Sequence, residues 1–249
     1  QNIALDRIRQ AFVVGDPAAT LCVEFYNDRK EDLPPRLDAL EEDLKARGTG
    51  YFFHRDTEPT SQQRIWSLRE AALGLSMAVK EDAKSISFVE DTAVHPERLS
   101  EFIGRFLNII HGHETTAGIY AHASVGCLHV RPVLNLKDPS DVALMRRVAE
   151  ETFELVREYK GSHSGEHGDG LVRSEFHAEM FGERIVSAFG AVKQAFDPEG
   201  LLNPNRIVDP PKMDDRTLLR YGPGYGAVGD FVPKLDWSDH PGPLGGMLG

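Results

Sequence analysis

Over the first two thirds of the chain, short segments with an apolar residue at every second position alternate with longer segments of helical periodicity. TLCVEF (20–25) has the alternation of a half-buried strand. GYFFH (50–54) and SISFVE (85–90) are predicted as strands for the same reason, with turn signals between them. The apolar pattern therefore predicts a sheet built from short strands.

The intervening segments place apolar residues on one face of a helix. Residues 34–48 carry Leu37, Leu40 and Leu44 on one stripe, and Gly48 follows where a left-handed helix cap forms most easily. The same reasoning predicts further helices at 59–79, 96–113, 139–159 and 174–196.

Residues 116–136 predict a hairpin of two more strands, with its turn near Val125 and Gly126. Strands that share a face with helices, without a repeating βαβ pattern, favour an α+β fold: an antiparallel sheet with helices packed on one face, followed by a C-terminal helical segment. From about residue 209 the sequence is rich in Pro, Gly and Asp, which predicts an irregular tail or linker. The expected organisation is one domain over 1–208 and a tail over 209–249.

The composition narrows the classes of function. With 249 residues and 41% hydrophobic content the chain can bury a substantial core, and no apolar run is long enough for a membrane span. A net charge of -11 opposes binding to nucleic acid or anionic membranes, since phosphate-rich partners need an excess of Lys and Arg on the contacting face. The lack of a visible signal segment predicts a cytoplasmic protein.

Cysteine usage and the chain ends add two expectations. Only Cys22 and Cys127 are present, which excludes a disulfide framework and any four-cysteine zinc or iron–sulfur site within these residues. The chain begins with Gln1 and ends in a glycine-rich stretch, so we expect it to be a piece of a longer protein.

The predicted hairpin carries the first candidate chemistry. A turn at Val125 and Gly126 would put His122 directly opposite His129, with Cβ atoms about 5 Å apart. Both imidazole rings could then reach one cation. Two ordinary half-exposed strand histidines explain the same spacing equally well.

The loop SHSGEHGDG (162–170) supplies a carboxylate. A catalytic divalent site needs a third ligand and an open position beside two imidazoles, and Glu166 is the first choice for that ligand, with Asp169 the second. Binding of a nucleotide phosphate is disfavoured, because GEHGDG matches neither common phosphate-binding motif and its two acids would repel an anion.

Three motifs in order, AHASVGCLHV, SGEHGDGLVR and AFDPEGLLNPNRIV, resemble the C-terminal domain of FAD-linked oxidases. That family includes glycolate oxidases, D-lactate dehydrogenases and D-2-hydroxyglutarate dehydrogenases, and the resemblance covers approximately residues 20–208. It implies a ferredoxin-like cap domain that covers the isoalloxazine ring of FAD and supplies the substrate pocket. An FAD-binding domain earlier in the same polypeptide would hold most of the cofactor.

The function implied by this resemblance is the substrate-binding and flavin-capping portion of an FAD-dependent dehydrogenase. The enzyme would oxidise a small 2-hydroxy acid of the D-lactate, glycolate or D-2-hydroxyglutarate class to the 2-oxo acid, and this chain alone is expected to be inactive. By the same resemblance, His122, His129 and Glu166 hold a divalent metal such as zinc or manganese. His167 would be the catalytic base beside the flavin, and Asn203 would lie near the flavin as well.

The resemblance also implies substrate-binding residues. Arg69 would form paired hydrogen bonds with the substrate carboxylate. Arg131, on the same strand face as His129, would bind a second anionic group and favour a dicarboxylate or a larger hydroxy acid. Lys84 lies close to where the family often has a substrate-contacting lysine, although in a shifted register.

The tail beyond residue 209 resembles the connector before an iron–sulfur domain in long members of the family. The resemblance therefore implies an iron–sulfur cluster in the full-length protein and electron transfer from the flavin to a quinone or another carrier. Such a protein would be cytoplasmic, with peripheral attachment at the inner membrane face as an option.

Two other functions use the same residues. A stand-alone metal-binding or ligand-sensing module would keep the pocket without redox activity. A zinc hydrolase would use His167 as base beside the predicted metal ligands. A glycine-rich FAD-binding domain ahead of Gln1 would favour the flavoenzyme over the sensing module, whereas hydrolysis by this chain alone would favour the hydrolase.

Overall fold

The computed structural model describes residues 3–77, 81–225 and 234. The chain divides into two compact units, Gln1–Ser76 and Met77–Gly249. The sequence did not predict this division, and the predicted boundary between 208 and 209 stays a prediction.

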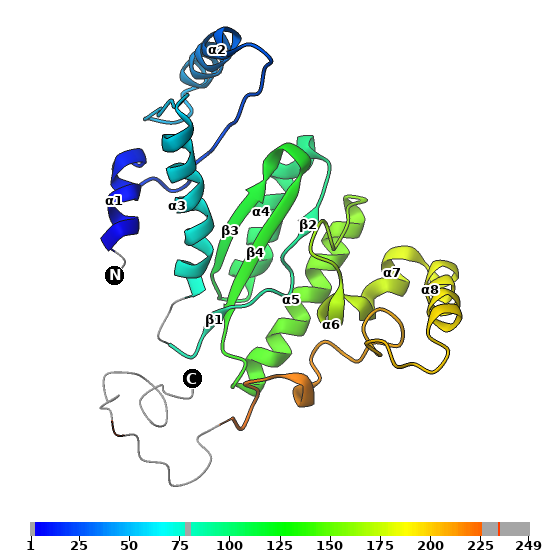
Figure 1. The fold of residues 1–249 in the computed structure, drawn as a ribbon. Coiled ribbons are helices and arrows are strands. Elements are labelled where there is room, and N and C mark those ends of the chain that lie inside the picture. Colours follow the sequence, from blue (N-terminus) through cyan, green and yellow to red (C-terminus); the bar gives the residue numbers. More distant parts are fainter. Residues whose placement is uncertain (1–2, 78–80, 226–233, 235–249) are drawn as a thin grey trace. The chain divides into compact units, whose positions relative to one another are not determined.

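The first unit is helical (Figure 1). Its α-helices are α1 (Ile3–Phe12), α2 (Leu33–Ala46) and α3 (Pro59–Met77), the last of which ends at the division between the units. The helices predicted at 34–48 and 59–79 are thus confirmed over the described residues, while 78–80 lie outside them.

The strands predicted in the first unit are wrong. Residues 20–25 and 50–54 have no strand assignment, and Leu21 and Tyr51 are 70% and 66% exposed. Alternation of apolar residues fits a half-buried strand, but a strand also needs a neighbour that pairs with its main-chain groups. Neither segment has such a partner among the described residues.

The second unit contains an antiparallel sheet centred on β4 (Cys127–Leu134). The strand β3 (Ala117–His122) pairs with β4 over its whole length. The short strands β1 (Lys84–Ser85) and β2 (Thr92–Ala93) pair with opposite ends of β4. The strand predicted at 85–90 is therefore wrong beyond Ser85, where β1 ends, although Phe88 and Val89 are completely buried.

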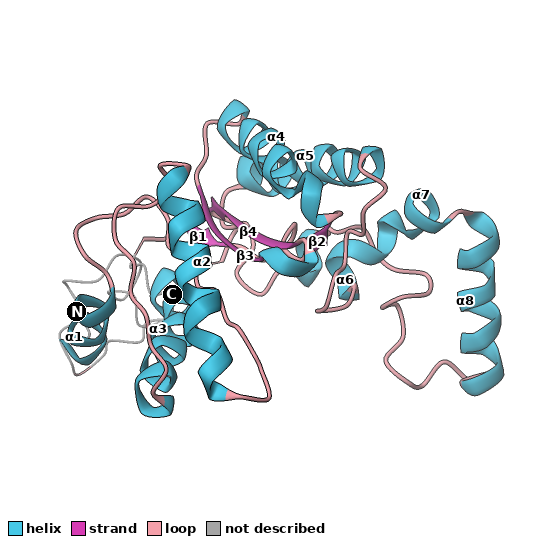
Figure 2. Cartoon of the chain, turned by 90° about the horizontal axis from the view of Figure 1, so that it is seen from above, coloured by secondary structure: helices cyan, strands magenta, loops and turns pink. Residues whose placement is uncertain are grey.

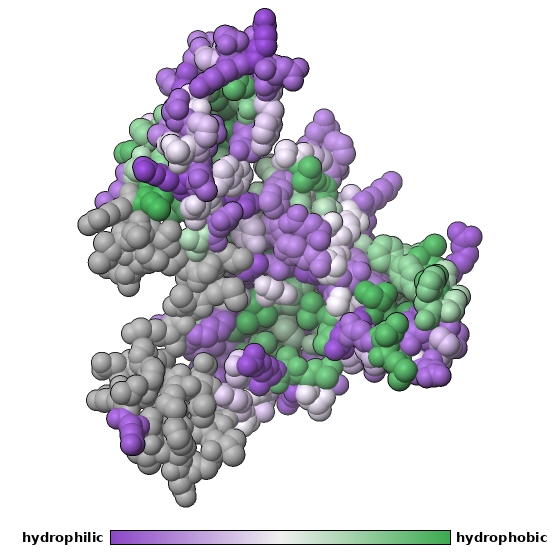
Figure 3. All heavy atoms as spheres, in the orientation of Figure 1, coloured by the Kyte–Doolittle hydropathy of each residue, from purple (hydrophilic) through white to green (hydrophobic). Residues whose placement is uncertain are grey.

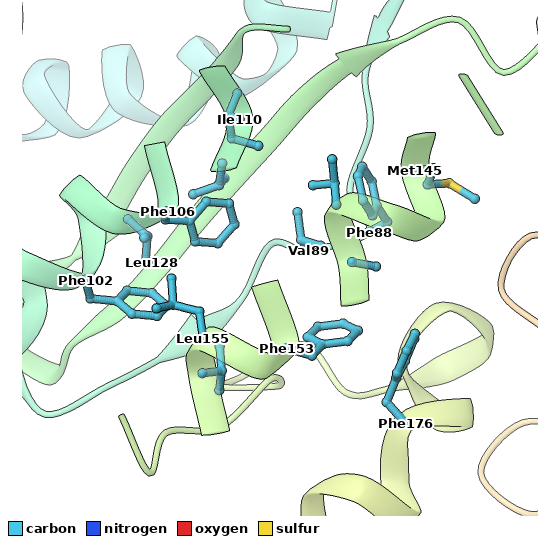
Figure 4. Packing of buried hydrophobic residues seen from close by; sticks show 14 of the residues in the cluster. Phe88, Val89, Phe102, Phe106, Ile110, Leu128, Met145, Phe153, Leu155 and Phe176 are labelled. Atoms are coloured by element: carbon cyan, nitrogen blue, oxygen red, sulfur yellow. The ribbon is translucent and has the colours of Figure 1, made fainter. Parts of the chain in front are cut away.

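Helices α4 (Leu99–Gly112) and α5 (Pro139–Glu158) cover one face of this sheet (Figure 2). Their apolar residues pack with Leu128 and neighbouring side chains of the sheet in the core drawn in Figure 4. The predicted α+β fold, with helices on one face of an antiparallel sheet, is confirmed. Because side chains alternate along a strand, Cys127, His129 and Arg131 of β4 are directed to the face opposite these helices.

The hairpin has a different register from the predicted one. His122 pairs with Cys127, and His129 pairs with Tyr120, so the two histidines are diagonal neighbours rather than direct partners. The loop is a 3-10 turn over Ala123–Val125, completed by Gly126 in the left-handed region at φ 72°. The centre of the turn therefore lies one position closer to the N-terminus than predicted.

Gly126 should be irreplaceable in this loop. A Cβ atom there would lie 1.8 Å from the carbonyl oxygen of Val94, and the backbone is already in a region that disfavours other residues. We expect Gly126→Ala to lower the free energy of unfolding by about 2 kcal/mol or more. Denaturant unfolding measures the change. Gly104→Ala in α4 is the control, since its Cβ would meet no atom within 4 Å, and equal stability losses in the two variants would contradict the expectation.

The helix predicted at 174–196 is broken into shorter pieces. After α6 (Gly170–Arg173), a 3-10 turn leads to α7 (His177–Phe181), and α8 (Glu183–Phe196) follows after Gly182 at φ 80°. Apolar side chains gather on the surface over α7 and α8 (Figure 3), where Val192 and Phe196 are 59% and 82% exposed.

The beginning of the tail packs against the rest of the second unit. Met213 is buried within the core, and its main-chain N–H donates to the carboxylate of Glu175. The irregular segment predicted from residue 209 thus contacts the domain at Lys212 and Met213. Within the described residues, the helices lack the combination of length and apolar character that a membrane span requires.

Candidate metal and active site

The hairpin brings two imidazoles to the sheet face that α4 and α5 leave free. The rings of His122 and His129 have centroids 5.3 Å apart and are nearly perpendicular. His129 is completely buried, whereas the side chain of His122 is 39% exposed. The interpretation of both as ordinary half-exposed histidines is therefore wrong for His129.

The segment after α5 is fastened to β2 by its main chain. Ala93 and Ser162 exchange two hydrogen bonds of 2.8 Å, and the N–H of Gly165 donates to the carbonyl oxygen of Asp91 at 2.7 Å. A Cβ atom on Gly161 would lie only 2.3 Å from the carbonyl oxygen of Ala93, so this approach requires glycine. These hydrogen bonds place the loop that contains Glu166 and His167 at the face of the sheet that α4 and α5 leave free.

Asp91 orients the two residues at the centre of that loop. Its carboxylate is fully buried and accepts hydrogen bonds from the main-chain N–H groups of Glu166 and His167, both at 2.9 Å. Burial alone would raise the pKa of Asp91, but the two hydrogen bonds, together with the charges of His167 and Arg173, lower the pKa below its ordinary value. Asp91 is thus held as a carboxylate that fixes the loop.

One oxygen of Glu166 is the point where the imidazoles converge. Its Oε1 atom lies 3.4 Å from Nε2 of His122, 3.2 Å from Nε2 of His129 and 3.3 Å from Nε2 of His167. Two ligands held at zinc-like distances with a tetrahedral angle are themselves separated by about 3.4 Å. The separations from Glu166 to each imidazole are thus of the size found between ligands of one metal ion, while the His122 and His129 ring centroids are 5.3 Å apart.

The tightest group of candidate ligand atoms differs from the predicted one. Asp91, His129, Glu166 and His167 have ligand atoms that all lie within 4.8 Å of one another. His122 reaches this group through its contact with Glu166. Asp91 already accepts main-chain hydrogen bonds, which leaves the imidazoles and Glu166 as the better donors for a cation.

Burial keeps His129 suited to bind a metal. Removal from water, and then the neighbouring His167 ring, lower the pKa of His129, so its neutral form with a free lone pair is favoured. Cys127 lies beside it, with Sγ 3.8 Å from His129 Nε2. Burial raises the pKa of Cys127 to about 12, so this sulfur remains a thiol at neutral pH and is a poor metal ligand.

A chain of polar contacts leads from His167 to the interior. Its Nδ1 atom lies 3.4 Å from Oε1 of Glu90, a buried carboxylate whose other oxygen accepts a hydrogen bond of 2.6 Å from Nε of Arg131. Arg131 also donates to the hydroxyl group of Tyr120, and the Tyr120 ring stacks on His129. A carboxylate at Nδ1 is the arrangement that orients a basic imidazole and stabilises its protonated form.

Three other predicted site residues belong to other elements of the chain. Arg69 belongs to α3 of the first unit, where its guanidinium lies 5.5 Å from the centre of the Trp66 ring. Lys84 pairs with Leu134, at the end of β4 distant from Cys127. Asn203 lines a groove between α8 and the segment that follows it.

Several residues of the site were missed by the sequence reasoning. Glu90 and Asp91 form an acidic pair directly after the apolar run that ends at Val89, and this position was the available signal. Tyr120 precedes His122 by two positions on the same strand face. No pattern pointed to Arg173, which donates to the carbonyl oxygen of Glu90 at 3.0 Å.

Comparison with known proteins gives matches over most of the chain. The family description "FAD linked oxidases, C-terminal domain" matches residues 2–207. A D-2-hydroxyglutarate dehydrogenase of Escherichia coli (strain K12) is 37% identical over 188 residues, which are 76% of this chain and 18% of the relative.

Two further relatives extend this comparison. A D-2-hydroxyglutarate dehydrogenase of Pseudomonas putida is 35% identical over 226 residues, 88% of this chain and 22% of the relative. The glycolate oxidase protein GlcD of Escherichia coli (strain K12) is 28% identical over 209 residues, 82% of this chain and 40% of that relative. The chain thus spans about a fifth of the length of its relatives that are more than a third identical.

Proposed function

This chain belongs to the family of FAD-linked oxidases, C-terminal domain, and from that premise we propose that it forms the substrate-binding and flavin-capping part of an FAD-dependent dehydrogenase. The substrate would be a small 2-hydroxy acid of the D-2-hydroxyglutarate, D-lactate or glycolate class, which is oxidised to the 2-oxo acid. The relatives named D-2-hydroxyglutarate dehydrogenases make that acid the first substrate to test. An FAD-binding domain, and in the full-length protein an iron–sulfur domain, would complete the path of the electrons.

The observation that carries this proposal is the convergence of three imidazoles on Oε1 of Glu166, at 3.2–3.4 Å. We propose that His122, His129 and Glu166 hold a divalent cation, zinc or manganese. Such a cation, when bound, polarises the hydroxyl and carboxylate oxygens of the substrate. Two imidazoles and a carboxylate leave coordination positions open for those oxygens.

His167 is proposed as the base. Its Nε2 atom would take the proton of the substrate hydroxyl group, while Glu90 at Nδ1 would stabilise the protonated ring across 3.4 Å. The flavin supplies the acceptor for the hydride from Cα. His167 therefore does only acid–base work in this proposal.

The remaining predicted residues have supporting roles in the proposal. Arg131 would hold Glu90 in position through its buried ion pair, in addition to the predicted contact with an anionic group of the substrate. Arg69 and Lys84 are kept as candidates for binding the substrate carboxylates. Asn203, which lines the groove beside α8, is kept as a candidate for contact with the flavin.

Metal content tests the ligand assignment. We expect His122→Ala to lose one equivalent of bound divalent metal, because half of the imidazole pair disappears while the partly exposed position tolerates alanine. Elemental analysis of the purified protein before and after the substitution measures the loss. His95→Ala is the matched control, since that imidazole is 69% exposed and outside the cluster. Equal metal content in all three proteins would refute the assignment.

A stand-alone metal-binding or ligand-sensing module remains the second candidate, because this cluster is complete within the second unit without any flavin-binding domain. The two candidates differ in one measurement. A flavin-containing form of the protein should be reduced by a 2-hydroxy acid, whereas a sensing module would bind the acid without any change in flavin absorbance.

A further inference from the structure

A second group of candidate metal-binding side chains lies in the second unit and shares no residue with the group around Glu166. It consists of His163, Asp169 and His177, whose ligand atoms all lie within 4.8 Å of one another. His163 follows the segment fastened to β2, Asp169 precedes α6, and His177 begins α7. The group therefore joins three pieces of chain that the fold brings together.

Both imidazoles of this group are buried and unsatisfied. His163 and His177 are 0% and 2% exposed, and neither ring nitrogen of either residue has a hydrogen-bond partner within the described part of the chain. Leaving a buried polar atom unpaired costs about 1–3 kcal/mol. Of these four nitrogens, the two Nε2 atoms face the carboxylate of Asp169, so a cation shared by the three side chains would satisfy both rings.

The carboxylate of Asp169 is directed at these rings. Its Oδ1 atom lies 3.5 Å from Nε2 of His163, and its Oδ2 atom lies 3.2 Å from Nε2 of His177. Although Asp169 precedes α6, its side chain accepts no hydrogen bond from the first turn of that helix. The separations are near the value of about 3.4 Å expected between two ligands of one tetrahedral zinc ion.

The surroundings explain why the rings are available as ligands. Phe153 and Phe181 pack against His163, and Phe189 packs against His177, so both rings sit among aromatic side chains. This burial lowers the pKa of His163 to about 4, which leaves the ring neutral with a free lone pair at neutral pH. The adjacent His177 ring lowers the pKa of Asp169, so its carboxylate is charged.

We infer that His163, Asp169 and His177 form a second divalent-metal site, of the zinc class, that nothing in the proposed reaction uses. Two imidazoles and one carboxylate suit zinc and neighbouring transition metals. The side chain of Asp169 is 21% exposed, which leaves room for water as a further ligand. A cation here ties α7 to the loop that carries the proposed base.

One positive charge opposes this cation. The guanidinium of Arg173 lies near enough to His163 and Asp169 to lower the pKa of both. That charge is engaged elsewhere, since Arg173 donates to the carbonyl oxygens of Gly168 and Glu90 and lies 3.8 Å from a carboxylate oxygen of Asp91. The carboxylate of Asp169 therefore remains available to a bound metal.

The test counts zinc in the two sites separately. The protein is stripped of metal with a chelator and titrated with Zn²⁺ alone, and the wild-type chain should bind one equivalent at each site. His163→Leu together with His177→Leu should remove one equivalent and leave the other, because leucine fills the apolar cage without offering a lone pair. Adding His122→Ala to this double variant should remove the remaining zinc.

Unchanged zinc binding in the double leucine variant would overturn the second site. If the double leucine variant loses zinc while His122→Ala keeps the wild-type content, the second site stands and the proposed catalytic metal is refuted. The two proposals can therefore be refuted separately. Asp169→Asn keeps the shape of the side chain if the leucine variant does not fold. It should also lose one equivalent of zinc, and a full complement of zinc in it would overturn the inference.

Discussion

Replacing His167 by alanine should lower the rate of flavin reduction by a 2-hydroxy acid by a factor on the order of 10²–10⁴, while the protein retains its flavin. The reason is that this imidazole is proposed to take the hydroxyl proton. Of the three imidazoles that lie near Oε1 of Glu166, His122 and His129 are proposed metal ligands, which leaves His167 as the base. Anaerobic stopped-flow measurement of flavin bleaching in the flavin-containing protein gives the rate.

The control for this experiment is His95→Ala, which removes a largely exposed imidazole of the same unit and should leave the rate unchanged. A further variant, Glu90→Gln, keeps the hydrogen-bonding shape at Nδ1 but removes the charge opposite the protonated ring. It should shift the pH profile of the reaction as well as its rate. Reduction at the wild-type rate in His167→Ala would eliminate this residue as the base.

Replacing Asp91 by alanine should cost about 3–5 kcal/mol of stability, which corresponds to a fall of roughly 6–20 °C in melting temperature. The substitution removes the acceptor for two main-chain N–H groups of the loop and leaves the buried guanidinium of Arg173 without its nearby carboxylate. Thermal and denaturant unfolding followed by circular dichroism measure the loss.

A matched control and the response to acid sharpen this prediction. Asp82→Ala removes an exposed carboxylate whose ion pair with Lys137 spans 2.7 Å, and it should cost about 1 kcal/mol or less. Because the pKa of Asp91 is lowered in the folded chain, its contribution to stability is complete above the ordinary value of 3.8 and is lost as the pH falls through the lowered pKa. Asp91→Ala should therefore lose less stability than the wild type below pH 3.8. Equal stability of Asp91→Ala and Asp82→Ala would contradict the role of Asp91.

The fold was predictable where one element could be recognised from its own residues. Amphipathic periodicity correctly located α2 and α5, while the helix predicted from residue 96 begins as a 3-10 turn over Pro96–Arg98 and continues as α4 from Leu99. The failed strands had correct alternation but no pairing neighbour, which a local pattern does not contain. The break at Gly182 was missed because one glycine within a helical pattern is compatible with a continuous helix.

The candidate site was partly predictable for a related reason. His122, His129, Glu166 and His167 do come together, but the hairpin register was wrong because it depends on the left-handed conformation of Gly126 and on the packing of Gly126 against Val94. Asp91 was missed because its role lies in accepting main-chain hydrogen bonds from residues 75 and 76 positions later. The grouping of His163 with His177 depends on how α6 and α7 fold back, which no spacing in the sequence reveals.

The attachment of the loop to β2 through main-chain atoms has an evolutionary consequence. Since Ala93 holds Ser162 by its peptide groups alone, the attachment is indifferent to most side chains along that stretch. Residues of that stretch other than Gly161 can therefore change without direct loss of these main-chain hydrogen bonds. Residues proposed for catalysis, Glu166 and His167, can therefore stay the same while a position within five residues of them changes.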